Sequence, residues 1–469
     1  MSTNRLLPAA GAMLAGMPLL AQAGVNGAEL SAIWAVPFAG LLLSIALMPL
    51  FAANIWHHHF GKIAAGWALA FALPFALSHG TGLTLHEMAH TLALEYIPFI
   101  ILLVALFTVA GGIYVRGNLH GSPLLNTGFL GIGTLLASFT GTTGASMLLI
   151  RPLLRANDNR RNKTHVFVFF IFLVANIGGS LTPLGDPPLF LGFLKGVGFG
   201  WTMQHMLAPM LTASAVLLLA FYLLDRYYYH KEEDLPPLPD PTPDSRVSLL
   251  GKVNLLLLLA IIGAVLLSGM WKPGVSWQLA GLEIELQNVV RDVLLLAIAG
   301  LSLWLTPGNC RQANAFNWGP MLEVGKLFAA IFITMIPVLA MLKAGQLGAF
   351  SGLVGMVSQP DGSPVNTAYF WLTGTLSSFL DNAPTYLVFF NLAGGDAVHL
   401  MGQGAQTLLA ISAGAVFMGA NSYIGNAPNF MVKAIAEERG VRMPSFFGYI
   451  GWALCCLIPT FILQTFLFF

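Results

Sequence analysis

The chain has 469 residues, of which 56% are hydrophobic and only 9% carry a charge, and its mean hydropathy is +0.75. A soluble protein has about a quarter charged residues, so this composition indicates a polytopic membrane protein. The net charge of +1 gives no basic surface for a nucleic-acid partner. The three cysteines have no metal-site spacing and are too few for a disulfide framework.

Residues 1–23 resemble a secretory signal peptide. Arg5 precedes a short apolar stretch that ends in Ala21-Gln22-Ala23, an A-x-A cleavage pattern. The alternative is an additional first helix that is retained. With either alternative, a signal of this kind predicts a multi-pass protein of a bacterial inner membrane, with its mature N-terminus in the periplasm.

Apolar runs of about 20 residues, enough to cross a bilayer, divide the chain into two halves of similar layout. In the first half, 24–226, plain helices are expected near 30–52, 61–79, 93–115 and 205–225, and interrupted apolar regions at 124–155 and 165–197. A polar, Pro-rich linker, expected in the cytoplasm, occupies 227–250. In the second half, 251–469, plain helices are expected near 251–271, 288–306, 321–343 and 446–468, and interrupted regions at 367–392 and 405–436.

The interruptions recur with a constant offset of 240 residues. Ser138-Phe139 corresponds to Ser378-Phe379 (138 to 378), and Gly185-Asp186-Pro187-Pro188 corresponds to Gly425-Asn426-Ala427-Pro428 (185 to 425). Irregular backbone at membrane depth must be buried in protein or line a cavity. Paired interruptions in two halves of a chain therefore predict the substrate site of a transporter.

Two positively charged clusters predict the orientation of the repeats. One comprises Arg155, Arg160, Arg161 and Lys163, and the other Lys433, Arg439 and Arg442. If both are cytoplasmic, region 124–155 is a re-entrant hairpin from the cytoplasm and 367–392 one from the periplasm. The expected fold is all-α with two inverted repeats, each containing a re-entrant helical hairpin and a broken transmembrane helix, and about ten crossings.

Two carboxylates lie within the interruptions, Asp381 in the second hairpin and Asp186 in the first broken helix. A carboxylate at membrane depth usually faces a cavity and binds an ion or a proton. The alternative for each is a purely structural helix cap. The neutral polar residues expected to assist them are Thr142, Thr143, Asn176, Thr182, Asn382, Asn421 and Asn426.

Three further groups have ordinary structural interpretations beside functional ones. Glu323 and Lys326 are three residues apart near the start of an expected helix, so they can form an ion pair. This pair either takes part in ion coupling or is a snorkelling pair at the membrane edge. His86-Glu87-Met88-Ala89-His90 matches the H-E-x-x-H pattern of zinc proteases. This segment is expected in a short connection, and no third metal ligand is evident nearby. Both points favour an ordinary polar loop over the zinc site of a protease. The run His57-His58-His59 is likewise expected in a loop.

The interrupted segments resemble the ion transporter superfamily, in particular its NhaD-type sodium/proton antiporters and its citrate-transport branch. The resemblance rests on Asn176-Ile177-Gly178-Gly179, on Thr182-Pro183-Leu184-Gly185-Asp186-Pro187-Pro188, on Leu380-Asp381-Asn382-Ala383-Pro384, and on Gly419-Ala420-Asn421 leading to Gly425-Asn426. It covers roughly residues 30–469 and implies two inverted repeats and a homodimer. NhaD-type antiporters also have an acidic residue in the first hairpin tip, where this chain has Thr140-Gly141-Thr142-Thr143-Gly144.

The sequence thus predicts a cation-coupled secondary transporter in the lipid bilayer rather than an enzyme. The leading hypothesis is a sodium/proton antiporter in which Asp186 and Asp381 exchange Na⁺ for H⁺, with no cofactor and no other metal. The alternative is a Na⁺- or H⁺-coupled transporter of citrate or another carboxylate, which the neutral first tip and the helix N-termini favour.

Overall fold

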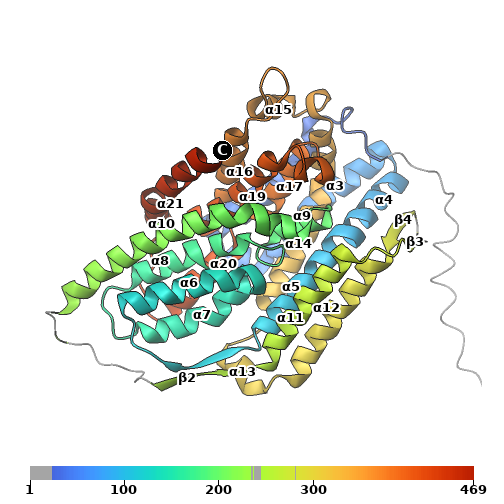
Figure 1. Ribbon diagram of the computed structural model, residues 1–469. Coiled ribbons are helices and arrows are strands. Elements are labelled where there is room, and N and C mark those ends of the chain that lie inside the picture. The colour runs from blue at the N-terminus through green and yellow to red at the C-terminus, as the bar shows by residue number, and fades with distance from the viewer. Residues whose placement is uncertain (1–23, 234–235, 237–244, 280) are drawn as a thin grey trace, which may run out of the picture.

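The computed structural model describes residues 24–233, 236, 245–279 and 281–469, and it is predominantly helical (Figure 1). The predicted signal peptide, 1–23, lies outside the described residues. Within the part of the chain that is described, nine helices are long and apolar enough to cross a membrane. Two shorter apolar helices, Thr164–Ser180 and Ala405–Asn421, belong to the interrupted regions. The prediction of a helical, polytopic membrane protein is confirmed.

One group of helices, which we call the frame, combines the first helices of both halves. Its members are η1 (Ala32–Ala35), α2 (Val36–Phe51), α3 (Ala53–His79), α4 (Thr81–Thr91), the π-helical turn η2 (Leu92–Tyr96), α5 (Ile97–Ala110), α11 (Val253–Met270), α12 (Leu286–Leu305), α13 (Gly308–Ala313) and α14 (Gly319–Lys343). Helix α3 packs against α2 and α14, and α12 packs against α5 and α11. Figure 1 shows α5, α11 and α12 side by side along one flank.

The second group, the core bundle, contains all the interrupted regions. Its members are α6 (Pro123–Thr140), α7 (Thr142–Ala156), α8 (Thr164–Leu173), η3 (Ile177–Ser180), α9 (Pro187–Leu194), α10 (Phe199–Glu233), α16 (Asn366–Phe379), α17 (Asn382–Leu392), α18 (Ala397–Met401), α19 (Ala405–Met418), η5 (Gly419–Asn421), α20 (Ala427–Glu438) and α21 (Phe446–Phe468). The two halves interlock, because α9 packs against α17 and α7 against α20. Short helices η4 (Gly345–Leu347) and α15 (Ser351–Val357) lead from the frame into the second half of this bundle.

Helices α6 and α7 form a hairpin whose two ends are hydrogen-bonded to each other. The Gly121 amide donates to the Ala156 carbonyl at 2.6 Å. The side chains of Asn126 and Asn157 exchange two hydrogen bonds of 2.9 Å just beside it. The chain therefore enters and leaves this hairpin on the same side of the molecule. Helices α16 and α17 pack against each other in the corresponding part of the second half.

Two segments expected to be loops are helical. Helix α3 begins at Ala53, so His57-His58-His59 lies in its second turn. Helix α4 includes His86 to His90, because the chain breaks only at Gly80, whose φ is +98°. Gly82 is accommodated within the helix.

The described parts of the predicted linker are mostly helix and strand, and four short strands were not anticipated. Tyr227–Glu233 continues α10. Strand β2 (Ser245–Leu250) pairs antiparallel with β1 (Tyr114–Asn118), which follows α5. Strands β3 (Ser276–Leu279) and β4 (Leu282–Glu285) form a hairpin before α12. The β1–β2 pair therefore joins the chain just after α5 to the chain just before α11, where the second half begins.

Candidate functional site

The helices that follow the interruptions begin at equivalent positions in the two halves. Helix α7 starts at Thr142 and α17 at Asn382, while α9 starts at Pro187 and α20 at Ala427. Each pair is separated by the same 240 residues as the motifs. At the first hairpin tip the chain turns through Gly141 with a φ of +78°, a conformation that favours glycine.

The same side-chain hydrogen bond ties each hairpin to its broken helix. The Thr182 hydroxyl donates to the Ser138 carbonyl, and the Ser422 hydroxyl donates to the Ser378 carbonyl, 240 residues later. All four residues are buried, so neither hydroxyl is free to reach a ligand. Thr182, which the sequence suggested as a binding residue, is thus placed to hold the hairpin rather than to line the cavity.

Asp186 lies where the four interruptions meet. Its side chain, only 1% exposed, precedes α9 in the first broken helix. It accepts hydrogen bonds from the Thr142 hydroxyl at 2.9 Å and from the Asn426 amide at 3.2 Å. The Asn382 amide donates to its other oxygen. Since these donors come from the first hairpin, the second broken helix and the second hairpin, one carboxylate contacts every other interrupted element.

Asp186 also lines a small cavity between the core bundle and the frame. The cavity has a volume of about 60 Å³, which is room for about two water molecules. Its polar wall includes Thr143 and Asp381, and its apolar wall comes from the frame helices α5 and α14, with Leu106 and Phe328 among the residues. No lysine, arginine or histidine is among the described residues that line it.

Asp381 is partly buried at the second hairpin tip. It precedes α17, and its carboxylate accepts a hydrogen bond from the Ala383 amide at 3.1 Å, so it caps this helix. The cap does not exclude the functional role, because the same side chain lines the cavity with Asp186. The side-chain oxygen of Asn382, Oδ1, is buried beside it and has no hydrogen-bond partner among the described residues.

Asn176 holds Asn426, one of the donors to Asp186, and is itself bonded to Asn429, a residue that the sequence did not single out. The Asn176 amide donates to the Asn429 side-chain oxygen at 2.7 Å, and its own oxygen accepts from Asn426 at 3.3 Å. Asn429 in turn donates to the carbonyls of Gly419 and Ser422 at 2.9 Å. An asparagine in the first turn after Pro428 was the only sequence signal for this role.

The remaining predicted residues lie outside this contact network. Asn421 donates to the Ser378 hydroxyl at 2.9 Å and is not among the cavity-lining residues. Glu323 and Lys326 are both on α14, but within the described chain they do not form an ion pair. The Lys326 ammonium lies 5.5 Å from the centre of the Phe60 ring. His86 and His90 share no group of three candidate metal ligands in the described residues.

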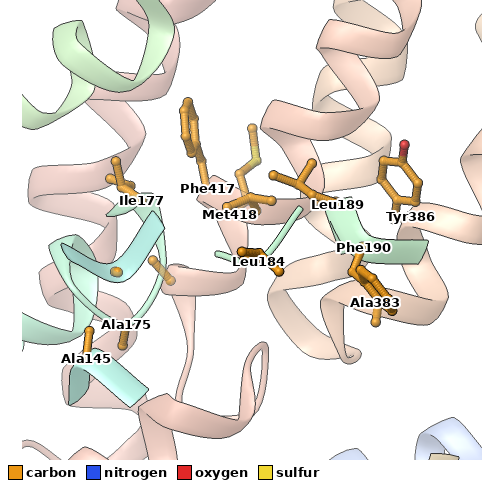
Figure 2. Packing of buried hydrophobic residues seen from close by; sticks show 14 of the residues in the cluster. Ala145, Ala175, Ile177, Leu184, Leu189, Phe190, Ala383, Tyr386, Phe417 and Met418 are labelled. Carbon is orange, nitrogen blue, oxygen red and sulfur yellow. The ribbon is translucent and has the colours of Figure 1, made fainter. Parts of the chain in front are cut away.

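Apolar side chains from both halves fill the space around the broken segments. Figure 2 shows Ile177, Leu184, Phe417 and Met418 around the breaks, with Tyr386 near α9. The first four are at most 2% exposed. This packing surrounds the polar residues of the site with apolar side chains, so electrostatic interactions there are stronger than in bulk solvent.

Comparison with known proteins agrees with this arrangement. Residues 27–469 match the model of a family described as "Putative citrate transport". The chain belongs to this family. Two uncharacterized transporters, from Mycobacterium bovis and Mycobacterium tuberculosis, are each 24% identical to it over 394 residues. These alignments cover 80% of this chain and 85% of each relative.

Family membership confirms the citrate-transport branch of the resemblance and supports a transporter. The zinc-protease alternative therefore has no support from the relatives. The resemblance to NhaD-type antiporters, the transported species and the inner membrane of a bacterium stay predictions.

Proposed function

We propose that this member of the citrate-transport family is a cation-coupled secondary transporter, and specifically a sodium/proton antiporter. The observation that carries the proposal is the buried Asp186 carboxylate, which receives donors from all three other interruptions. A carboxylate held in this way is a fixed site for a small cation or a proton.

The chemistry of the cavity favours a cation over an anion. Asp186 and Asp381 both line it, and the side-chain oxygen of Asn382, which has no partner among the described residues, is buried next to Asp381 at the second hairpin tip. Oxygen atoms of this kind are the ligands that hard cations prefer. A volume of about 60 Å³ suits a partly hydrated ion, whereas a tricarboxylate requires the cavity to widen first.

Competition for the carboxylates would couple the two ions. Burial favours the protonated form of a carboxylic acid, while a bound cation favours the ionised form. Na⁺ and H⁺ therefore exclude each other at Asp186 and Asp381. Binding one ion on one side of the membrane and the other ion on the opposite side gives antiport.

Alternating access would follow from movement of the core bundle relative to the frame. The cavity lies between these two groups, with Thr142 and Asp381 on one wall and the α5 residue Leu106 on the other. The joined ends at Gly121 and Ala156 support a first hairpin that is re-entrant from one side. Together with the 240-residue offset, they support inverted repeats. We propose a homodimer in the bacterial inner membrane as the working form.

The test is Asp381→Asn in proteoliposomes. Asparagine caps a helix as well as aspartate does, so the variant is expected to fold. We expect Na⁺-driven proton flux, followed with an internal pH dye, to fall by about 100-fold or more. The matched control is Asp361→Asn, which removes an exposed carboxylate whose partner is Ser363. Unchanged flux in folded Asp381→Asn protein would exclude the proposed role.

The second candidate is a Na⁺- or H⁺-coupled transporter of citrate or another carboxylate. Besides the family description, four helix N-termini favour it, because α7, α9, α17 and α20 all begin at or beside the cavity. Helix N-termini attract anions. Uptake of labelled citrate that depends on a Na⁺ or H⁺ gradient, without citrate-independent proton flux, would establish this alternative.

A further inference from the structure

A second, larger cavity lies away from Asp186, where the two positively charged clusters meet. It has a volume of about 450 Å³. The lining residues are Arg161, Asn162, Lys163, Thr164, His165, Tyr228, Gly440, Val441, Arg442 and Trp452. The wall thus combines the start of α8, the end of α10 and the connection between α20 and α21. None of these residues lines the cavity of the proposed transport site.

The two halves of the chain are joined directly at this cavity. The Thr164 hydroxyl donates to the Arg442 carbonyl at 3.0 Å. Both positively charged clusters therefore lie on one face, as expected if both are cytoplasmic. Because Thr164 is also the first residue of α8, whose preceding residue makes no side-chain cap, backbone N–H groups are available there.

The cationic side chains of this cavity are incompletely neutralised by the protein. The Arg442 side chain is exposed and makes no ion pair with any described residue. Lys163 Nζ donates to the Asp158 carbonyl at 3.0 Å. Burial lowers the pKa of the Lys163 ammonium, with Asp158 and Glu232 opposing that shift. A bound anion would stabilise both cations.

The nearby carboxylates are already occupied. Asp225, below the cavity, contacts Arg160 at 2.6 Å and His165 at 2.7 Å. The Glu232 carboxylate accepts from the backbone amides of Arg161 and Asn162 at 3.2 and 2.6 Å. Asp225 and Glu232 are thus engaged within the protein, while Lys163 and Arg442 form no ion pair with any described residue.

We propose that this cavity binds a phosphate-bearing anion at the membrane surface. Lysine, arginine and helix N–H groups are the donors that recognise phosphate oxygens. Trp452, in the second turn of α21, and Tyr228, in α10, both line the wall; such aromatic rings are typical of the headgroup level of a bilayer. Basic pockets between helices on the cytoplasmic side are known to accept anionic lipid headgroups. The headgroup of an anionic phospholipid and a free phosphate compound share this chemistry.

The experiment uses the full-length protein in a neutral detergent. Binding of phosphatidylglycerol, inorganic phosphate and pyrophosphate is measured by native mass spectrometry and by ligand-dependent thermal stabilisation, with phosphatidylcholine as the uncharged reference and citrate as the non-phosphate anion. The variants are Arg442→Gln, which alters an exposed side chain, and the double variant with Lys163→Gln. The control is Arg246→Gln, an exposed arginine of β2 that does not line the cavity.

We expect phosphatidylglycerol to bind more tightly than phosphatidylcholine, with about a tenfold loss in Arg442→Gln and a larger loss in the double variant. The control should bind as the unmodified chain does. Saturation by inorganic phosphate or pyrophosphate alone, lost in the same variants, would support the site and identify a free ligand as its source. Equal binding in all variants, or a preference for citrate over every phosphate compound, would overturn the proposal.

Discussion

The first and second halves hold their interruptions with the same bonds and present different side chains to the cavity. Thr182 contacts Ser138 as Ser422 contacts Ser378. At the equivalent cavity positions, however, Gly141 in the first half corresponds to Asp381 in the second. The hydrogen bonds that hold the interruptions are therefore the same in both halves, whereas the side chains at the cavity differ in charge.

The two carboxylates lie in different kinds of interruption, one in a broken helix and one in a hairpin tip. Asp186 belongs to a broken helix and has Asn426 as its counterpart, while Asp381 belongs to a hairpin tip and has Gly141. Four helix N-termini at or beside the cavity supply a positive potential of roughly half a charge each. This positive potential lowers the cost of ionising a carboxylate beside it.

The largest effect is expected from moving the charge between the halves. Asp186→Asn should lower exchange by about 100-fold or more, because the ion loses its central ligand. Adding Asn426→Asp places a carboxylate at the equivalent position, beside the Asp186 oxygen that Asn426 contacts at 3.2 Å. We expect the double variant to recover about tenfold over the single one. The measurement is Na⁺-driven proton flux in proteoliposomes.

Size-exclusion profiles and thermal unfolding of the single and the double variant show whether each of them is folded. A folded double variant as inactive as Asp186→Asn would show that the two broken helices are not interchangeable. The asymmetry would then depend on more than the position of one charge.

A smaller effect, on stability, is expected from placing a side chain at Gly141, the position in the first hairpin tip that corresponds to Asp381 in the second. Gly141→Ala and Gly141→Asp each force a side chain onto a φ of +78°, at a cost of about 1–3 kcal/mol in stability. The added Cβ itself meets nothing closer than 3.5 Å, so the cost is in the backbone. Denaturant unfolding in detergent measures it.

Gly128→Ala within α6 is the matched control, because no atom lies within 4 Å of the added methyl group and alanine is the better helix former. It should leave stability unchanged or raise it. If Gly141→Ala behaved in the same way, the tips would not differ in backbone strain.

The smallest effect is expected from the repeated hydroxyl bonds. Thr182→Val and Ser422→Ala each remove one buried donor and should lower stability by about 1 kcal/mol, to a similar extent in both halves. Thr182→Ser and Ser422→Thr retain the hydroxyl and are the controls. Thermal unfolding with and without Na⁺ gives the comparison. A selective loss of Na⁺ stabilisation in Thr182→Val would place this hydroxyl in the ion site.

The interruptions could be predicted because their cause is local. Gly and Pro weaken or break a helix within an apolar run, and the polar residues beside them at Asp186 and Asp381 indicated the candidate site. The convergence of Asn382 and Asn426 on Asp186 could not be derived in this way, since it joins residues about 200 positions apart through tertiary packing. Asn429 was overlooked because its partners are backbone carbonyls that only the broken helix exposes.

The errors elsewhere have similar causes. Strand β1 forms only because β2 meets it from across the polar linker, with Tyr114 opposite Leu250. The His86 segment was expected in a connection because it lies between the helices expected near 61–79 and 93–115, but the chain turns at Gly80 alone and continues as α4. Local composition indicates where a helix can break, and tertiary contacts decide where it does.

The donor set of Asp186 has a consequence for biogenesis. Thr142 precedes the aspartate in the chain, whereas Asn382 and Asn426 follow it by almost half the sequence. During synthesis the buried carboxylate therefore waits with a single one of these partners until the second half has been inserted. A nascent chain that stops after α10 lacks the two amide donors that the second half supplies to this carboxylate.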